Sequence, residues 1–172
     1  RNADPALKNI KIGCGLATAL GCTLEGNVPE DETLRVLEQV LEAGVEEVML
    51  PDTVGYATPH HMHNVIRTLR NRVPNIDQAV ISIHCHDDLG LATANTLAGI
   101  RAGARQGEVT MNGIGERAGN TSLEEIAMIL KSRKHLNLMS NINPRKIYRT
   151  SRLVSTLMHM PVQPNKAIVG RN

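Results

Sequence analysis

The residues best suited to chemistry stand in one short motif, His84-Cys85-His86-Asp87-Asp88. The five residues before it, 79–83, are apolar and mostly β-branched, which favours a buried strand. Side chains alternate between the two faces of a strand, so we expect His84 and His86 to point one way and Cys85 the other. Two imidazoles on one face at a strand end can bind a single divalent ion.

A glycine-rich stretch, residues 112–120, supplies a further candidate ligand. Asn120 at its end can add a carbonyl oxygen to the two imidazole nitrogens. Mixed nitrogen and oxygen ligation suits Mn²⁺, Mg²⁺ or Zn²⁺ better than a structural thiolate zinc site. An alternative stays open, in which the histidines are only hydrogen-bonded at a strand end and Asn120 only caps the next helix.

These residues need a scaffold, and the chain alternates strand-like with helix-like segments. We expect strands at residues 11–20, 45–50, 79–83 and 106–111, and helices at residues 31–43, 58–72, 91–102 and from 121 onward. Four strand–helix units in succession predict an α/β fold with a parallel sheet and right-handed crossovers. Such folds place their sites at the carboxyl ends of the strands, where both motifs fall.

The pattern changes at about residue 134. A loop at residues 141–143 precedes an amphipathic helix at 144–158, and residues 161–166 form an extended tail. We therefore divide the chain into a domain of residues 1–133 and the start of a helical linker subdomain, residues 134–172.

The composition excludes some classes of function. A chain of 172 residues, 41% hydrophobic and 21% charged, is ordinary for one soluble globular domain. The absence of Trp and Phe and the net charge of +2 argue against nucleic-acid binding. We find no apolar run that could cross a membrane and no signal peptide. Three cysteines without metal-finger spacing indicate reduced thiols and a cytoplasmic location.

Several segments together resemble the 2-isopropylmalate synthase family. They are residues 52–56, 84–88, 103–106, 112–120 and 163–170. This family belongs to a superfamily of metal-dependent acyl-CoA aldolases and lyases built on a TIM barrel. The resemblance implies that the four strands are strands five to eight of the barrel, so that residues 1–133 form its carboxyl half. Residues 21–29 are more similar to 3-hydroxy-3-methylglutaryl-CoA lyase of the same superfamily.

The resemblance also implies a reaction and its partners. The family joins acetyl-CoA to a 2-oxo acid, 3-methyl-2-oxobutanoate in leucine biosynthesis, with a divalent metal as Lewis acid. It implies that His84, His86 and Asn120 are the metal ligands. It also implies an acid–base or water-ordering role for Glu116 and a hydrogen bond from Thr53 to the oxo acid.

The residues themselves leave plainer alternatives. Glu116 can form a loop ion pair with Arg117, and Thr53 can be a turn hydroxyl. Asp87 and Asp88 can orient the histidines or cap the helix that starts near residue 91. The histidines at positions 60, 61 and 63 fit a solvated helix face better than a second metal site.

The chain departs from the family pattern at several points. We find no Arg-Asp-Gly motif, whose Asp is a metal ligand in the family, and residues 17–20 lack the Glu found there in the synthases. Gly107 stands where a branched apolar residue is usual. The lyase's loop cysteine is also absent from residues 112–120, which disfavours the lyase.

Two rival hypotheses therefore accompany the synthase. One is another member of the superfamily, such as a citramalate or homocitrate synthase or a hydroxymethylglutaryl-CoA lyase. The other is a half-barrel without catalytic activity. An open half-barrel exposes sheet edges and apolar surface, so we expect this chain to form a homo-oligomer.

Overall fold

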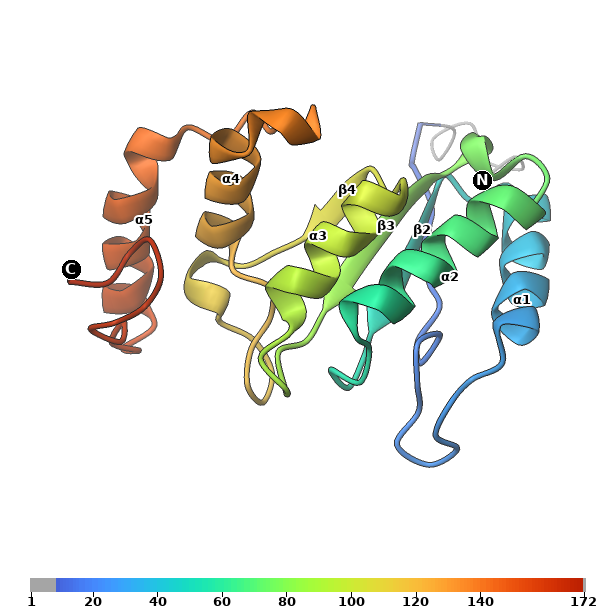
Figure 1. The fold of residues 1–172 in the computed structure, drawn as a ribbon, viewed down its shortest axis with the longest axis horizontal. Coiled ribbons are helices and arrows are strands. Elements are labelled where there is room, and N and C mark those ends of the chain that lie inside the picture. The colour runs from blue at the N-terminus through green and yellow to red at the C-terminus, as the bar shows by residue number, and fades with distance from the viewer. Residues whose placement is uncertain (1–8, 172) are drawn as a thin grey trace.

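Four parallel strands form one sheet whose spatial order follows the sequence, β1-β2-β3-β4 (Figure 1). The computed structural model describes residues 9–171. The strands are β1 (Gly13–Gly15), β2 (Glu47–Asp52), β3 (Val80–Cys85) and β4 (Gln106–Glu108). Each is connected to the next through a helix: α1 (Glu30–Glu42), α2 (Pro59–Arg72) and α3 (Ala92–Ala102). Parallel strands in sequential order with helices between them are the repeating unit of a (β/α) barrel, so the predicted fold class, a partial barrel, is confirmed.

The helices begin and end close to the predicted residues because their signals are local. Thr58 precedes α2 and its hydroxyl accepts a hydrogen bond from the His61 backbone N–H at 3.2 Å, while Pro59 occupies the first turn. Gly103 ends α3 with a φ of 127°, a conformation that other residues rarely adopt.

The two edge strands are shorter than predicted. Only Gly13–Gly15 of the expected 11–20 strand pairs with β2, and the chain then turns through Thr18, whose φ is 61°. The expected 106–111 strand ends at Glu108, and the short 3₁₀ helix η3 (Met111–Gly113) follows. The Thr110 backbone N–H instead donates to the Thr121 carbonyl oxygen at 3.0 Å. Thr110 therefore pairs with the segment just before α4 (Leu123–Ser132) and not with a strand of the sheet.

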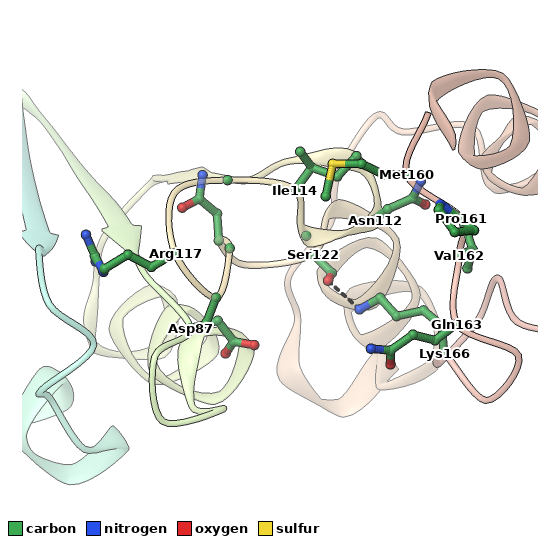
Figure 2. Close-up of a pocket in the computed structure, with 15 residues that line it drawn as sticks. Asp87, Asn112, Ile114, Arg117, Ser122, Met160, Pro161, Val162, Gln163 and Lys166 are labelled. Atoms are coloured by element: carbon green, nitrogen blue, oxygen red, sulfur yellow. Dashed lines mark hydrogen bonds between the residues drawn. The ribbon is translucent and has the colours of Figure 1, made fainter. Parts of the chain in front are cut away.

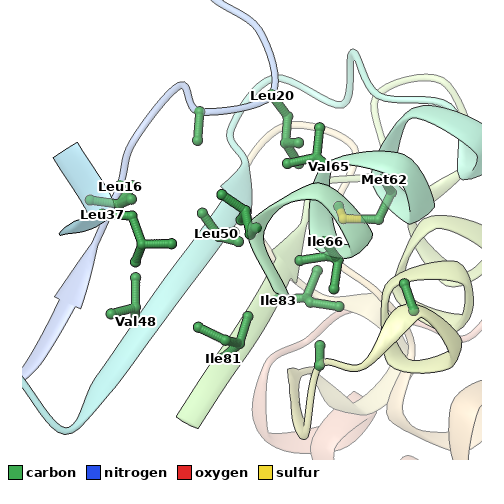
Figure 3. Close-up of a cluster of buried hydrophobic side chains, with 14 of the residues drawn as sticks. Leu16, Leu20, Leu37, Val48, Leu50, Met62, Val65, Ile66, Ile81 and Ile83 are labelled. Atoms are coloured by element: carbon green, nitrogen blue, oxygen red, sulfur yellow. The ribbon is translucent and has the colours of Figure 1, made fainter. Parts of the chain in front are cut away.

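An aliphatic core fills the space between the sheet and α1–α3, as a chain without Trp or Phe requires (Figure 3). It includes Leu37 of α1, Leu50 of β2, Ile66 of α2 and Ile83 of β3, all of them fully buried. Cys85 also belongs to this core, on the opposite face of β3 from His84. Burial raises the pKa of its thiol to about 12, so the thiol stays protonated.

The remaining helix, α5 (Pro144–Leu157), lies beside α4, at the end of the molecule away from α1 (Figure 1). The tail after it folds back, and Val169 packs with Ala127 and Ile147 in a second small apolar cluster. Arg152 of α5 donates to the Val169 carbonyl oxygen at 3.1 Å. None of the helices in residues 9–171 has the length and apolar character that a membrane span needs.

Candidate active site

The two histidines of the motif meet at the carboxyl end of β3. Their Nε2 atoms are 3.3 Å apart, and the rings lie edge to face with centroids 4.9 Å apart. Two nitrogens that each lie about 2.1 Å from one ion are separated by about 3.0–3.4 Å at ordinary ligand angles. The spacing therefore fits two ligands of one metal ion. It also fits a hydrogen bond between a protonated and an unprotonated nitrogen.

Glu108 at the end of β4 orients one of these rings. Its Oε2 lies 3.2 Å from His84 Nδ1, because the parallel register places His84 directly opposite Glu108. A carboxylate at Nδ1 holds the hydrogen there and directs the Nε2 lone pair toward His86, as the outer partners of metal-bound histidines do. Glu108 was not among the predicted site residues, because the expected strand ran on to residue 111 and placed it in the strand interior.

Asn120 lies alongside His86, through a backbone bridge between the two residues. Two hydrogen bonds flank this bridge, from Asp87 N–H to the Gly119 oxygen at 2.9 Å and from Thr121 N–H to the Cys85 oxygen at 3.1 Å. The side-chain oxygen Oδ1 of Asn120 is buried without a hydrogen-bond partner among the described residues. A buried oxygen in this condition suits a cation ligand. The cap of α4 is Ser122, so the helix-cap alternative for Asn120 is wrong.

The surroundings keep His86 in the form that binds metals. Burial is the largest cause that lowers its pKa, followed by the charges of His84 and Arg117, while Asp88 and Glu116 raise it. A lowered pKa keeps the imidazole neutral at neutral pH, and only the neutral ring offers a lone pair.

Two nitrogens and one oxygen make an incomplete ligand set. Within residues 9–171, no three side chains of His, Cys, Asp or Glu come close enough together to hold a metal ion. The neighbouring residues His84, His86 and Asn120 fit a divalent ion only if water or a bound molecule completes its coordination.

Thr53 comes directly after β2, the strand that pairs with β3. Its hydroxyl oxygen accepts a hydrogen bond from the Thr18 backbone N–H at 3.0 Å, which fixes the side chain and leaves its hydrogen for another acceptor. Thr53 therefore acts as a turn hydroxyl toward Thr18, and its hydroxyl hydrogen can still be donated to a bound acid.

Glu116 and Arg117 form the ion pair that the sequence left as an alternative. The pair spans 3.1 Å, and the Glu116 side chain is 73% exposed. Arg117 also contacts Asp88 Oδ1 at 2.7 Å and donates to the Thr53 carbonyl oxygen at 2.8 Å. Arg117 thereby connects the loops after β2, β3 and β4. The sequence pattern indicated its pairing with Glu116 but not its contacts with Asp88 and Thr53.

The aspartates of the motif have separate roles. Asp87 accepts a hydrogen bond from the Ala92 backbone N–H at 2.9 Å at the start of α3, as its capping alternative proposed. Asp88 pairs with Arg117 instead, and the hydrogen bond from that guanidinium lowers the pKa of the Asp88 carboxyl.

A cavity of about 300 Å³ adjoins these loops (Figure 2). The glycine-rich loop with Asn112 and Asn120 forms one wall, and residues 160–166 form the other. Lys166 connects the two walls, because its Nζ donates to the Ser122 hydroxyl oxygen at 2.7 Å and to Glu125 Oε1 at 2.6 Å. The volume lies at the lower end of the range for small-molecule sites.

Comparison with known proteins places the chain in a family. The HMGL-like family model matches residues 2–154. The 2-isopropylmalate synthase of Shewanella amazonensis is 61% identical over 152 residues, which cover 88% of this chain and 29% of that protein. The synthase of Psychromonas ingrahamii is 56% identical with the same coverage. The chain thus spans less than a third of the length of these relatives.

Solved structures agree on the fold. The HMG-CoA lyase of Bacillus subtilis matches 95% of this chain and 55% of its own, with a TM-score of 0.79 and 26% identity. The carboxyl transferase domain of Rhizobium etli pyruvate carboxylase matches 86% of the chain and 24% of its own, with a TM-score of 0.68 and 18% identity. By its sequence, and in agreement with its fold, the chain belongs to the HMGL-like family.

Proposed function

We propose that this chain is the metal-binding half of a 2-isopropylmalate synthase barrel, an acyltransferase that condenses acetyl-CoA with 3-methyl-2-oxobutanoate in leucine biosynthesis. The observation that carries the proposal is the 3.3 Å between the Nε2 atoms of His84 and His86. Beside His86 lies Asn120, whose side-chain oxygen is buried without a hydrogen-bond partner among the described residues. Similarity to two synthases at 56% and 61% identity supports this reaction over that of the lyases.

The proposed metal ligands are His84, His86 and Asn120, and the ion is Mn²⁺, Mg²⁺ or Zn²⁺. Such an ion supplies Lewis-acid polarisation of the oxo acid's carbonyl group. Thr53 donates its hydroxyl hydrogen to the carboxylate of the oxo acid, since Thr18 already holds the hydroxyl oxygen. Glu108 keeps His84 in the tautomer whose Nε2 is the ligand.

Glu116 is proposed to handle a proton or order a water. Its exposed carboxylate is held at the rim by Arg117, which also ties the rim to Asp88. The carboxylate is therefore open to solvent while it stays paired with Arg117. Replacement by Gln keeps the size and removes the base, so Glu116→Gln should lower the turnover about a hundredfold or more.

Three further expectations stay proposals. The edge strands β1 and β4 each pair on one side only within the described sheet, so we propose that copies of the chain associate along these edges. Residues 134–172 are proposed to begin a linker subdomain, and the location is proposed to be cytoplasmic.

The test measures Mn²⁺ binding by electron paramagnetic resonance and release of CoA thiol from acetyl-CoA. We expect Mn²⁺ binding that His84→Ala abolishes and that His63→Ala, on the exposed face of α2, leaves unchanged. Thiol release should depend on 3-methyl-2-oxobutanoate rather than on pyruvate or 2-oxoglutarate.

Other outcomes select the rivals. A preference for pyruvate would identify a citramalate synthase, and one for 2-oxoglutarate a homocitrate synthase. Metal binding without thiol release for any oxo acid would leave a half-barrel without activity of its own. Equal Mn²⁺ binding by the two alanine variants would refute the metal site itself.

A further inference from the structure

Asn112 opens the glycine-rich loop and is attached by its side chain to α5. Its Nδ2 donates to the Ser151 carbonyl oxygen at 3.1 Å, and the Ser151 hydroxyl donates to Asn112 Oδ1 at 2.5 Å. Ser151 is fully buried. The two hydrogen bonds together fix both the position and the orientation of the Asn112 amide.

The backbone of Asn112 is attached as well, to α4. Its N–H donates to Oε2 of the fully buried Glu124 at 3.0 Å. Asn112 has a φ of 63°, in the left-handed region where asparagine is among the better-tolerated residues. Two helices outside the sheet thus hold this residue at three points.

The next residue carries this attachment to the candidate metal ligand. The carbonyl oxygen of Gly113 accepts a hydrogen bond from the Asn120 backbone N–H at 3.0 Å. A Cβ built on Gly119 would lie 2.0 Å from that same oxygen, so the two ends of the loop touch backbone to backbone. A shift of residues 112–113 must therefore shift residues 119–120.

We infer that Asn112 and Ser151 are positioning residues that set where Asn120 presents its side-chain oxygen. Through them α5 positions one ligand of the proposed metal site. The inference rests on the proposed function only in taking Asn120 as a metal ligand. Outer partners of this kind typically change metal affinity by about 10–100-fold when they are removed.

A purely structural role would give a different result. If the pair only fastens α5, its loss should loosen the helix without any specific effect on Asn120. Ser155 offers a matched control, because its hydroxyl also makes one hydrogen bond from α5, to the Met160 oxygen at 2.7 Å. Ser151→Ala and Ser155→Ala each remove one hydroxyl from the same helix.

The test compares these two variants by two readouts on the whole chain. The first is hydrogen exchange of the Asn120 backbone amide in the absence of metal, and the second is the affinity for Mn²⁺. We expect Ser151→Ala to speed exchange at Asn120 and to weaken Mn²⁺ binding about tenfold. Ser155→Ala should change neither readout by more than about twofold.

A second variant guards against failure of the first to fold. Asn112→Gly keeps the left-handed backbone but removes the side-chain attachment, and it should reproduce both effects of Ser151→Ala. Unchanged exchange at Asn120 in a folded Ser151→Ala or Asn112→Gly variant would overturn the inference. If wild-type chain binds no Mn²⁺, the proposed metal site fails, and the exchange result alone decides the positioning role.

Discussion

The barrel part of the chain, residues 9–133, and the C-terminal part, residues 134–171, are held in place by different forces. In the barrel part a continuous aliphatic core joins the sheet to three helices. The C-terminal part contributes Ile147, Val169 and the partly buried Val162 to a small cluster around Ala127. It is also held by directional contacts, such as those of Ser151 with Asn112 and of Lys166 with Glu125.

This difference assigns separate tasks to the two parts. Apolar contacts are non-directional and give stability in proportion to the area buried, whereas hydrogen bonds fix positions at a small net gain. The glycine-rich loop lies where the two parts meet. It therefore depends on the barrel part for its fold and on the C-terminal part for its orientation.

Matched core truncations test this contrast and should give the largest effect. Leu37→Ala removes a fully buried side chain from the barrel core and should lower the free energy of unfolding by about 2–5 kcal/mol. Ile147→Ala should release α5 locally, seen as faster hydrogen exchange in that helix, with a much smaller change in the main unfolding transition. Urea unfolding and exchange on the same samples measure both quantities.

Equal losses in the main transition from the two variants would contradict the contrast. In that case the C-terminal part would unfold together with the barrel part as one cooperative unit, and its hydrogen bonds would contribute to global stability.

The next largest effect is expected at Asp52, which holds its loop from within the barrel part. Its carboxylate accepts hydrogen bonds from the Tyr56 and Ala57 backbone N–H groups at 2.8 and 3.1 Å and from Asn95 Nδ2 at 3.2 Å. Asp52→Ala removes all three hydrogen bonds and leaves the buried Ala57 N–H without its acceptor, so it should cost about 3 kcal/mol of unfolding free energy. Ser151→Ala, in the C-terminal part, should lower the free energy of unfolding by about 1 kcal/mol in the same urea measurement.

Asp52→Asn is the control for charge, since it keeps the shape and the two backbone hydrogen bonds. It should cost less than Asp52→Ala. If all three variants lose the same free energy, the loop after β2 does not depend on buried hydrogen bonds more than the loop after β4 does.

Local signals explain why much of the fold could be predicted from the sequence. Thr58, Pro59 and Gly103 mark helix ends by their own chemistry, and alternation along β3 separates His84 from Cys85. The family resemblance adds the strand order, which periodicity alone does not contain.

The contacts that complete the site depend on residues far apart in the chain. Glu108 meets His84 only because of the parallel register, and Arg117 reaches Asp88 only after two loops have folded. The early end of β4 reflects a competing partner, since Thr110 pairs toward Thr121. No local pattern encodes such choices. The roles of Glu116, Thr53 and the three proposed ligands stay predictions for the same reason.

The smallest expected effect concerns pH at the junction of the two parts. Glu124 is fully buried, and burial raises its pKa above the ordinary 4.5, against the hydrogen bond from Asn112 and the charge of Lys166, which lower it. Between the unfolded and the folded pKa, the folded state therefore binds more protons than the unfolded state. Stability must then fall as the pH rises above about 4.5.

Glu124→Gln removes this titration and keeps an oxygen for the Asn112 N–H. The thermal midpoint of the variant should decline less steeply than that of wild-type chain from about pH 4.5 to about pH 7. Burial raises the pKa of Asp52 too, so Asp52→Asn should flatten the same curve from within the barrel part. An unchanged slope in Glu124→Gln, with a flattened one in Asp52→Asn, would assign the pH-dependent loss of stability to Asp52 and not to Glu124. The junction would then tolerate its buried carboxylate because Lys166 compensates the charge.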